Sequence, residues 1–265
     1  MNGLNFGIDF KGGTLIEIET QNKIEISEVR SSLNSLSLGD IQVQEFGSDK
    51  NLLIRIEQQQ GGDQIQQNVL EIVKQKLMND ISETINFRRT EVVGPKVSGE
   101  LIQSGTIAIL VAVFAMLIYI WLRFEWQFSL GAVIALLHDV ILTIGVFCLT
   151  QLEFNLPIIA AILTIVGYSM NDTVVVYDRV RENLRKFRSK EITSLLNLSI
   201  NETLSRTIVT SVTTLLALVS LYIFGGEVIK GFTFAMIWGV LVGTYSSIFV
   251  AAPLLTYLDV KREWN

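Results

Sequence analysis

A carboxylate and a guanidinium, two groups that are costly inside a bilayer, lie within or beside long apolar runs of this 265-residue chain. Asp172 lies near the end of one apolar run, and Arg206 lies at the start of the next. Ionisable groups at membrane depth commonly mark ion pathways or proton relays. Because successive membrane helices are antiparallel, we expect Asp172 and Arg206 to lie at similar depths and to pair, directly or through water.

The protonation state of such an aspartate would depend on whether the arginine is close to it. Apolar surroundings favour the neutral form of a carboxylic acid, and a nearby guanidinium favours the charged form. An aspartate that gains and loses contact with an arginine as helices move would therefore bind and release a proton. The alternative is a static ion pair that only fixes the packing of two helices.

A third ionisable residue, Asp139, follows His138 near the middle of another apolar run. We predict that Asp139 is a second relay carboxylate; structural hydrogen bonding is the alternative. Polar residues at helical spacing predict a supporting path for the relay, and we assign to it Asn171, Tyr168, Thr210 and Thr214. Threonine hydroxyls in membrane helices also simply bond the carbonyls of their own helix, so this support is modest.

Composition excludes several other chemistries. One Cys and one His cannot assemble a structural zinc site, which needs about four ligands. The segment 11–14, KGGT, lacks the spacing of a nucleotide-binding Walker motif. We therefore predict no enzyme activity, no cofactor and no metal. Residues 1–100 hold 10 Lys/Arg and 15 Asp/Glu, so the sequence predicts no nucleic-acid surface there.

Five long apolar runs predict an α-helical polytopic membrane domain over residues 98–265. A bilayer core of about 30 Å requires roughly 20 helical residues, and each run is that long or nearly so. The predicted membrane helices are 101–121, 128–149, 156–177, 207–224 and 232–256.

Charge predicts the orientation of these helices. The stretch from Asp178 to Arg206 carries seven Lys/Arg and should remain in the cytoplasm, whereas the short loop 151–155 carries only Glu153. The C-terminus would then lie in the cytoplasm, and the acidic N-terminal region would lie on the opposite side of the membrane.

Residues 1–97 predict a small soluble α+β domain. Alternating apolar and polar residues predict strands at 14–19, 41–46, 52–57 and 84–93, and helical periodicity predicts helices at 26–36 and after Gly61. The order βαββαβ is that of the ferredoxin-like fold.

Four segments in this order resemble the SecF members of the SecD/SecF family of protein translocase subunits. They are 3–14 (GLNFGIDFKGGT), 93–97 (VGPKV), 167–183 (GYSMNDTVVVYDRVREN) and 204–207 (LSRT), and the likeness covers essentially the whole chain. The resemblance implies a helical bundle related to the resistance–nodulation–division (RND) transporters. It also implies a first membrane helix before the segment 3–14, which this sequence does not contain.

The resemblance further implies a function, partners and site residues. Members of the family work with SecD and use the proton-motive force, or sodium in some relatives, to promote polypeptide export across the inner membrane. The implied partners are SecD, the SecYEG channel, the accessory subunit YajC, exported polypeptides and membrane lipids. Asp172 and Arg206 match family positions that serve proton passage, and Asp139 matches a family His-Asp position. The alternatives are an RND-type small-molecule exporter and a scaffold that takes no part in transport.

Overall fold

A computed structural model describes residues 3–59, 61–82, 84–258 and 260. The chain divides into two compact units. One consists of Asn5–Thr106 together with Glu153–Leu156, and the other consists chiefly of Ile107–Leu152 and the chain from Pro157 onward. The first unit thus runs beyond the boundary at residues 97/98 expected from the sequence, and it includes a short segment between two membrane helices.

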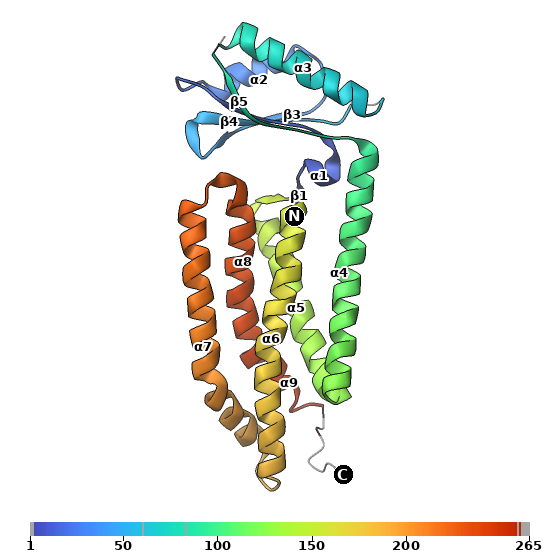
Figure 1. Ribbon diagram of the computed structural model, residues 1–265, viewed down its shortest axis with the longest axis vertical. Coiled ribbons are helices and arrows are strands. Elements are labelled where there is room, and N and C mark those ends of the chain that lie inside the picture. The colour runs from blue at the N-terminus through green and yellow to red at the C-terminus, as the bar shows by residue number, and fades with distance from the viewer. Residues whose placement is uncertain (1–2, 60, 83, 259, 261–265) are drawn as a thin grey trace. The chain divides into compact units, whose positions relative to one another are not determined.

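The first unit has the predicted ferredoxin-like arrangement. Its antiparallel sheet has the order β3-β4-β2-β5, and helices α2 and α3 lie on one face of that sheet (Figure 1). The bounds are Gly13–Glu19 (β2), Ile26–Asn34 (α2), Ile41–Phe46 (β3), Ser48–Ile56 (β4), Asp63–Asp80 (α3) and Asn86–Val93 (β5). Ile16 of β2 and Ile54 of β4 are fully buried in one cluster with residues of both helices. The neighbouring Leu15 and Leu53 are buried on the other face of the sheet, against Ile8, so the central strands are covered on both faces rather than on one.

Three short elements of this unit have no counterpart in the prediction. They are β1 (Asn5–Phe6), α1 (Ile8–Lys11) and β6 (Glu153–Phe154), and β1 pairs in parallel with β6. A two-residue strand contains no periodicity to detect, and this one pairs with a segment about 150 positions away. Arg55 forms an ion pair with Glu153, and the Asp9 carboxylate accepts a hydrogen bond of 2.7 Å from the backbone N–H of Leu156.

The second unit is a bundle of long apolar helices, and five helices among the described residues are long and apolar enough to cross a membrane. Their bounds are Pro95–Arg123 (α4, which begins in the first unit), Trp126–Thr150 (α5), Leu156–Lys186 (α6), Ile192–Phe224 (α7) and Glu227–Ser246 (α8). A π-helical turn, η1 (Ser247–Ala251), and a short helix, α9 (Ala252–Leu254), follow α8.

The five predicted apolar runs therefore all lie in helices, but the helices extend further than hydropathy indicated, α6 and α7 by the most. α6 continues to Lys186, and α7 begins at Ile192 rather than at 207. The added turns carry many polar and charged residues, which a search for apolar runs excludes. The polar segments 178–186 and 192–206 are joined by hydrogen bonds from Asn183 to Ser199 and Glu202.

Small residues allow close packing inside the bundle. A Cβ atom on Gly239 would overlap the side chain of Ile165, and one on Gly243 would lie 3.0 Å from the Cβ of Ser169. The Gly239-x-x-x-Gly243 pattern of α8 therefore faces α6, in keeping with the general use of small residues where membrane helices touch. Further along α6, Tyr177 is fully buried and donates a 3.0 Å hydrogen bond to the carbonyl of Ala251.

Candidate functional site

Asp172 lies in the interior of the bundle, held by hydroxyl groups from two other helical segments. The residue is 8 % exposed. Thr207 of α7 donates a 2.6 Å hydrogen bond to Oδ1, and Ser247 of η1 donates one to Oδ2. Both carboxylate oxygens are thereby satisfied, as a buried carboxylate requires.

Arg206 does not form the expected direct ion pair with Asp172. Within residues 3–59, 61–82, 84–258 and 260 no ion pair joins the two, and Arg206 is exposed on α7. Consecutive residues of a helix point about 100° apart. Thr207 faces Asp172, so the neighbouring Arg206 is turned away, which the depth argument from the sequence could not reveal. The direct form of the expected pair is thus absent between these two described residues, and pairing through water stays a prediction.

Asp139 of α5 is the most buried carboxylate among the described residues of the bundle, at 1 % exposure. Its Oδ2 accepts hydrogen bonds from Ser169 of α6 (2.5 Å) and Ser246 of α8 (2.7 Å). Its Oδ1 lies 2.9 Å from Nδ1 of His138. The His138 ring stacks on Tyr245, with ring centroids 6.4 Å apart. Asp139 thus joins three helices.

The predicted supporting path is only partly present as contacts between helices. Tyr168 of α6 donates to Ser211 of α7 (3.4 Å), and Ser211 lies 2.7 Å from the hydroxyl of Thr244 on α8. Thr210 and Thr214, in contrast, donate to carbonyls of their own helix. Asn171 is exposed. Thr210 and Thr214 thus bond within their own helix, which was the alternative to a supporting path.

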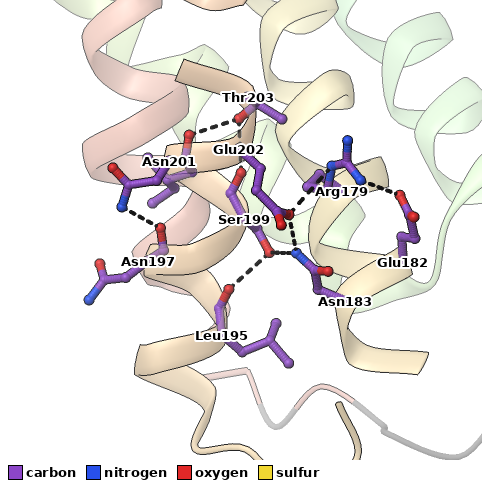
Figure 2. A network of polar contacts seen from close by, with 10 residues as sticks. Arg179, Glu182, Asn183, Leu195, Asn197, Ser199, Asn201, Glu202 and Thr203 are labelled. Carbon is purple, nitrogen blue, oxygen red and sulfur yellow. Dashed lines mark hydrogen bonds and ion pairs between the residues drawn. The ribbon is translucent and has the colours of Figure 1, made fainter. Parts of the chain in front are cut away.

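A separate polar network joins the ends of α6 and α7 beyond Asp172. Asn183 is buried and donates to Ser199 (3.0 Å) and Glu202 (2.7 Å), both on α7. Arg179 lies on the other side of Glu202 and donates to Glu182 (2.8 Å) (Figure 2). This network holds the two helices together one to three turns from the bond between Asp172 and Thr207.

Sequence reasoning singled out both buried carboxylates but missed most of their partners. Thr207, Ser247, Ser246 and Ser169 are single hydroxyl residues in apolar or small-residue surroundings, and such residues are frequent in membrane helices. Nearness in sequence could have pointed to two of them. Ser169 lies three residues before Asp172, and Thr207 directly follows Arg206. Ser246 and Ser247 gave no such signal. Among the described residues, no group of three or more His, Cys, Asp and Glu side chains could hold a metal ion.

Comparison with known families gives two matches along this chain. Residues 73–261 match the family described as "Protein export membrane protein SecD/SecF, C-terminal", and residues 1–24 match the "SecD/SecF GG Motif". The helices that carry Asp139 and Asp172 lie wholly within the first match.

Curated relatives are similar along nearly the whole chain. "Protein translocase subunit SecF" of Rickettsia bellii (strain OSU 85-389) is 49 % identical over 262 residues, covering 99 % of this chain and 86 % of that protein. The protein of the same name from Cereibacter sphaeroides is 50 % identical over 266 residues, covering 98 % of this chain and 82 % of that protein.

Solved structures agree in fold. The crystal structure of SecDF, a translocon-associated membrane protein from Thermus thermophilus, matches with a TM-score of 0.84 and 36 % identity over 96 % of this chain. SecDF in its super-membrane-facing form matches with a TM-score of 0.69 and 35 % identity. The chain spans about a third of these longer SecDF chains, 34 % and 35 %. By sequence and by structure, the chain belongs to the SecF family of SecD/SecF protein-export membrane proteins.

Proposed function

We propose that this membrane protein is an auxiliary subunit of the Sec export machinery that works with SecD and uses the proton-motive force to promote polypeptide translocation. The observation that carries the proposal is Asp172, a carboxylate buried inside the membrane bundle with a hydroxyl group on each oxygen. Its partner Thr207 directly follows Arg206, which supplies a guanidinium next to this contact. The names of the relatives describe a translocase subunit and no catalytic activity, so we place the chain among transport components and not among enzymes.

A carboxylate in this setting suits reversible proton binding. It lies in a low-polarity interior, where a proton on the carboxyl removes the cost of a buried charge. Its partners are hydroxyl groups, which can donate to a carboxylate or accept from a carboxylic acid. Moving one charge through the membrane potential yields about 2.3 kcal/mol per 100 mV. Asp172 would hold the proton, Asp139 would act as a second relay carboxylate, and Arg206 would stabilise the charged state when the helices shift.

The exposed face of α7 supports a second helical half as partner. Arg206 and Thr210 are exposed there, in a helix apolar enough to cross a membrane. Polar and charged groups within membrane spans face protein or water rather than lipid. SecD is the partner that the solved SecDF relatives favour. SecYEG, YajC, exported polypeptides and membrane lipids are further partners in the proposal.

The orientation is part of the proposal. The positively charged segment between α6 and α7 would lie in the cytoplasm of a bacterial cell, as would the C-terminus. The ferredoxin-like unit would then lie in the periplasm, where it could act on a polypeptide that leaves the channel.

The test is export of a preprotein into inner-membrane vesicles with and without a proton gradient. Asp172→Asn should abolish the stimulation by the gradient while the variant still co-purifies with its partners. Asp178→Asn is a matched control, because Asp178 is a partly exposed carboxylate on the same helix that pairs with Arg123. Undiminished, gradient-sensitive export with Asp172→Asn would refute the proposal.

One observation favours a second candidate, a scaffold without a transport role. Both oxygens of Asp172 are already satisfied, as they would be in a purely structural polar cluster. For such a scaffold, Asp172→Asn or Arg206→Ala would reduce export only by loss of partner subunits, which a pull-down would reveal.

A further inference from the structure

Two consecutive serines, Ser246 and Ser247, contact two different buried carboxylates. Ser246 donates to Oδ2 of Asp139 on α5 at 2.7 Å, and Ser247 donates to Oδ2 of Asp172 on α6. Both serines are fully buried. Because consecutive helical residues point about 100° apart, one segment can reach a different helix with each of the two side chains.

The two serines lie where α8 ends and the π-helical turn η1 begins. π-helical turns are rare insertions in α-helices and occur frequently at functional sites. Close packing of α8 on α6 brings this junction within reach of the carboxylates, since a Cβ on Gly243 would lie only 3.0 Å from the Cβ of Ser169.

Each serine has an alternative acceptor in its own helix. The Ser246 hydroxyl also lies 3.1 Å from the carbonyl of Gly243, and the Ser247 hydroxyl lies 3.0 Å from the carbonyl of Thr244. A carboxylate only accepts hydrogen bonds, whereas a protonated carboxyl group also donates one. When a proton arrives, the serine can therefore turn to its own carbonyl without leaving its hydroxyl unsatisfied.

We propose that Ser246 and Ser247 are positioning residues that couple the proton occupancy of Asp139 to that of Asp172 through the junction of α8 and η1. This proposal rests on the proposed function and extends it to the path between the two carboxylates. A change at one carboxyl re-orients its serine, shifts the adjoining turn, and changes the hydrogen bond that the neighbouring serine makes with the other carboxyl.

Other titratable groups surround the pair and must be kept intact in any test. On α5, His138 contacts Asp139, and on α8, Tyr245 stacks on His138. On α6, Tyr168 contacts Ser211, and on α7, Arg206 adjoins Thr207. Tyr177, on α6, contacts the carbonyl of Ala251 within η1. None of these groups bonds to either serine in the part of the chain that the structure describes.

A mutant cycle read by infrared spectroscopy tests the coupling in the full chain assembled with its SecD-type partner. The C=O stretching band of protonated Asp172 is assigned by its loss in Asp172→Asn. In the wild-type background, Asp139→Asn should shift the frequency of this band and the pH range over which the band disappears. In a variant that carries both Ser246→Ala and Ser247→Ala, Asp139→Asn should shift neither the band frequency nor the pH range.

Three further variants make the cycle decisive. Ser247→Thr keeps a hydroxyl and should retain the coupling. Ser220→Ala should leave the coupling unchanged, because it removes an exposed hydroxyl that donates to the Leu216 carbonyl of its own helix. Ser169→Ala removes the other hydroxyl on Asp139 and should also leave the response of Asp172 in place.

The outcomes separate this inference from the proposed function. If the displacement persists in full without the two serine hydroxyls, the carboxyls interact through space and the serine link is wrong. If Ser169→Ala alone abolishes the displacement, the coupling runs through α6 and the link is also wrong. In either case, a proton flux that is lost in Asp172→Asn would leave the proposed function standing.

Discussion

A 2.6 Å hydrogen bond from the Thr207 hydroxyl holds Asp172, so the buried aspartate of α6 contacts the residue that follows Arg206 on α7 and not the arginine itself. The groups that position the carboxylate are therefore different from the group that would stabilise its charge. Thr207 and Ser247 hold the carboxylate in place, and the guanidinium is left on the exposed side of α7. If α7 rotated about its own axis by the angle between two neighbouring residues, the guanidinium of Arg206 would take the place of the Thr207 hydroxyl beside Asp172.

Thr207→Ala should weaken gradient-driven export by about tenfold or more. A hydrogen bond to a charged group contributes ~1.5–3 kcal/mol, and a difference of about 1.4 kcal/mol corresponds to a factor of ten. Thr207→Ser keeps the hydroxyl and should restore most of the activity. The measurement is the initial rate of preprotein import into vesicles under an imposed gradient. Equal rates for the alanine and serine variants would show that the hydroxyl has no part in the process.

Gly239→Ala should destabilise the bundle by ~1–3 kcal/mol, the usual cost of overpacking a dense interior. The added methyl group would lie 2.8 Å from Cγ2 of Ile165 and nearer still to two other carbons of that side chain. A β-branched side chain on a helix has few other rotamers in which to avoid it.

Gly145→Ala is the control for this packing prediction, since nothing lies within 4 Å of the place where its Cβ would sit. Thermal unfolding of the two purified variants, followed by circular dichroism, gives the comparison. A melting temperature for Gly239→Ala at or above that of Gly145→Ala would contradict the close contact between α6 and α8.

Asn183→Ala should separate the ends of α6 and α7. It removes the buried amide that Ser199 and Glu202 contact and leaves Glu202 with fewer donors, at a cost of about 1–3 kcal/mol. Asn201→Ala is the matched control, because Asn201 is exposed and its side chain, among the described residues, bonds the Asn197 carbonyl of its own helix alone (Figure 2). Protease susceptibility of the loop between the two helices should rise in the first variant alone.

The burial of Glu153, the partner of Arg55, predicts a pH dependence of stability. Burial raises the pKa of the Glu153 carboxyl above its ordinary value of 4.5, and nearby Asp9 adds to the rise, although Arg55 opposes it. The folded protein therefore keeps this proton to higher pH than the unfolded chain. The resulting stability is present at low pH and is lost as pH rises through the raised pKa.

Thermal unfolding of the full chain and of Glu153→Gln at several pH values measures this effect. The advantage of the wild type over the variant should shrink as the pH rises above about 4.5, the ordinary glutamate value. An advantage that grows over the same interval would mean that Arg55 outweighs burial and lowers the pKa of the Glu153 carboxyl.

The sequence was sufficient for the longer strands and the membrane helices because each of these carries its own periodic or apolar signal. The strands around Ile16 and Ile54 alternate, and the membrane helices are long apolar runs. The pairing of Asn5–Phe6 with Glu153–Phe154 is a non-local contact of two-residue strands, which no periodicity records. The start of α7 at Ile192 was missed because its polar turns are stabilised by contact with α6 and not by hydropathy.

At the candidate site, the sequence located Asp172 and Asp139 because a carboxylate in an apolar run is conspicuous. It could not place Arg206, since depth along a helix axis does not specify the direction of a side chain around it. The serines that contact the two carboxylates were missed for a related reason. A buried serine has no distinctive signature until the helix opposite to it is known.

Proton movement itself tests the central proposal most directly. The chain and its SecD-type partner would be reconstituted into liposomes that contain a pH-sensitive dye, and a membrane potential would be imposed. The wild-type complex should admit protons well above the leak of empty liposomes, and Asp172→Asn should fall to that leak while Asp178→Asn does not. Proton entry through Asp172→Asn at the wild-type rate would contradict the assignment of Asp172 as the proton-carrying residue.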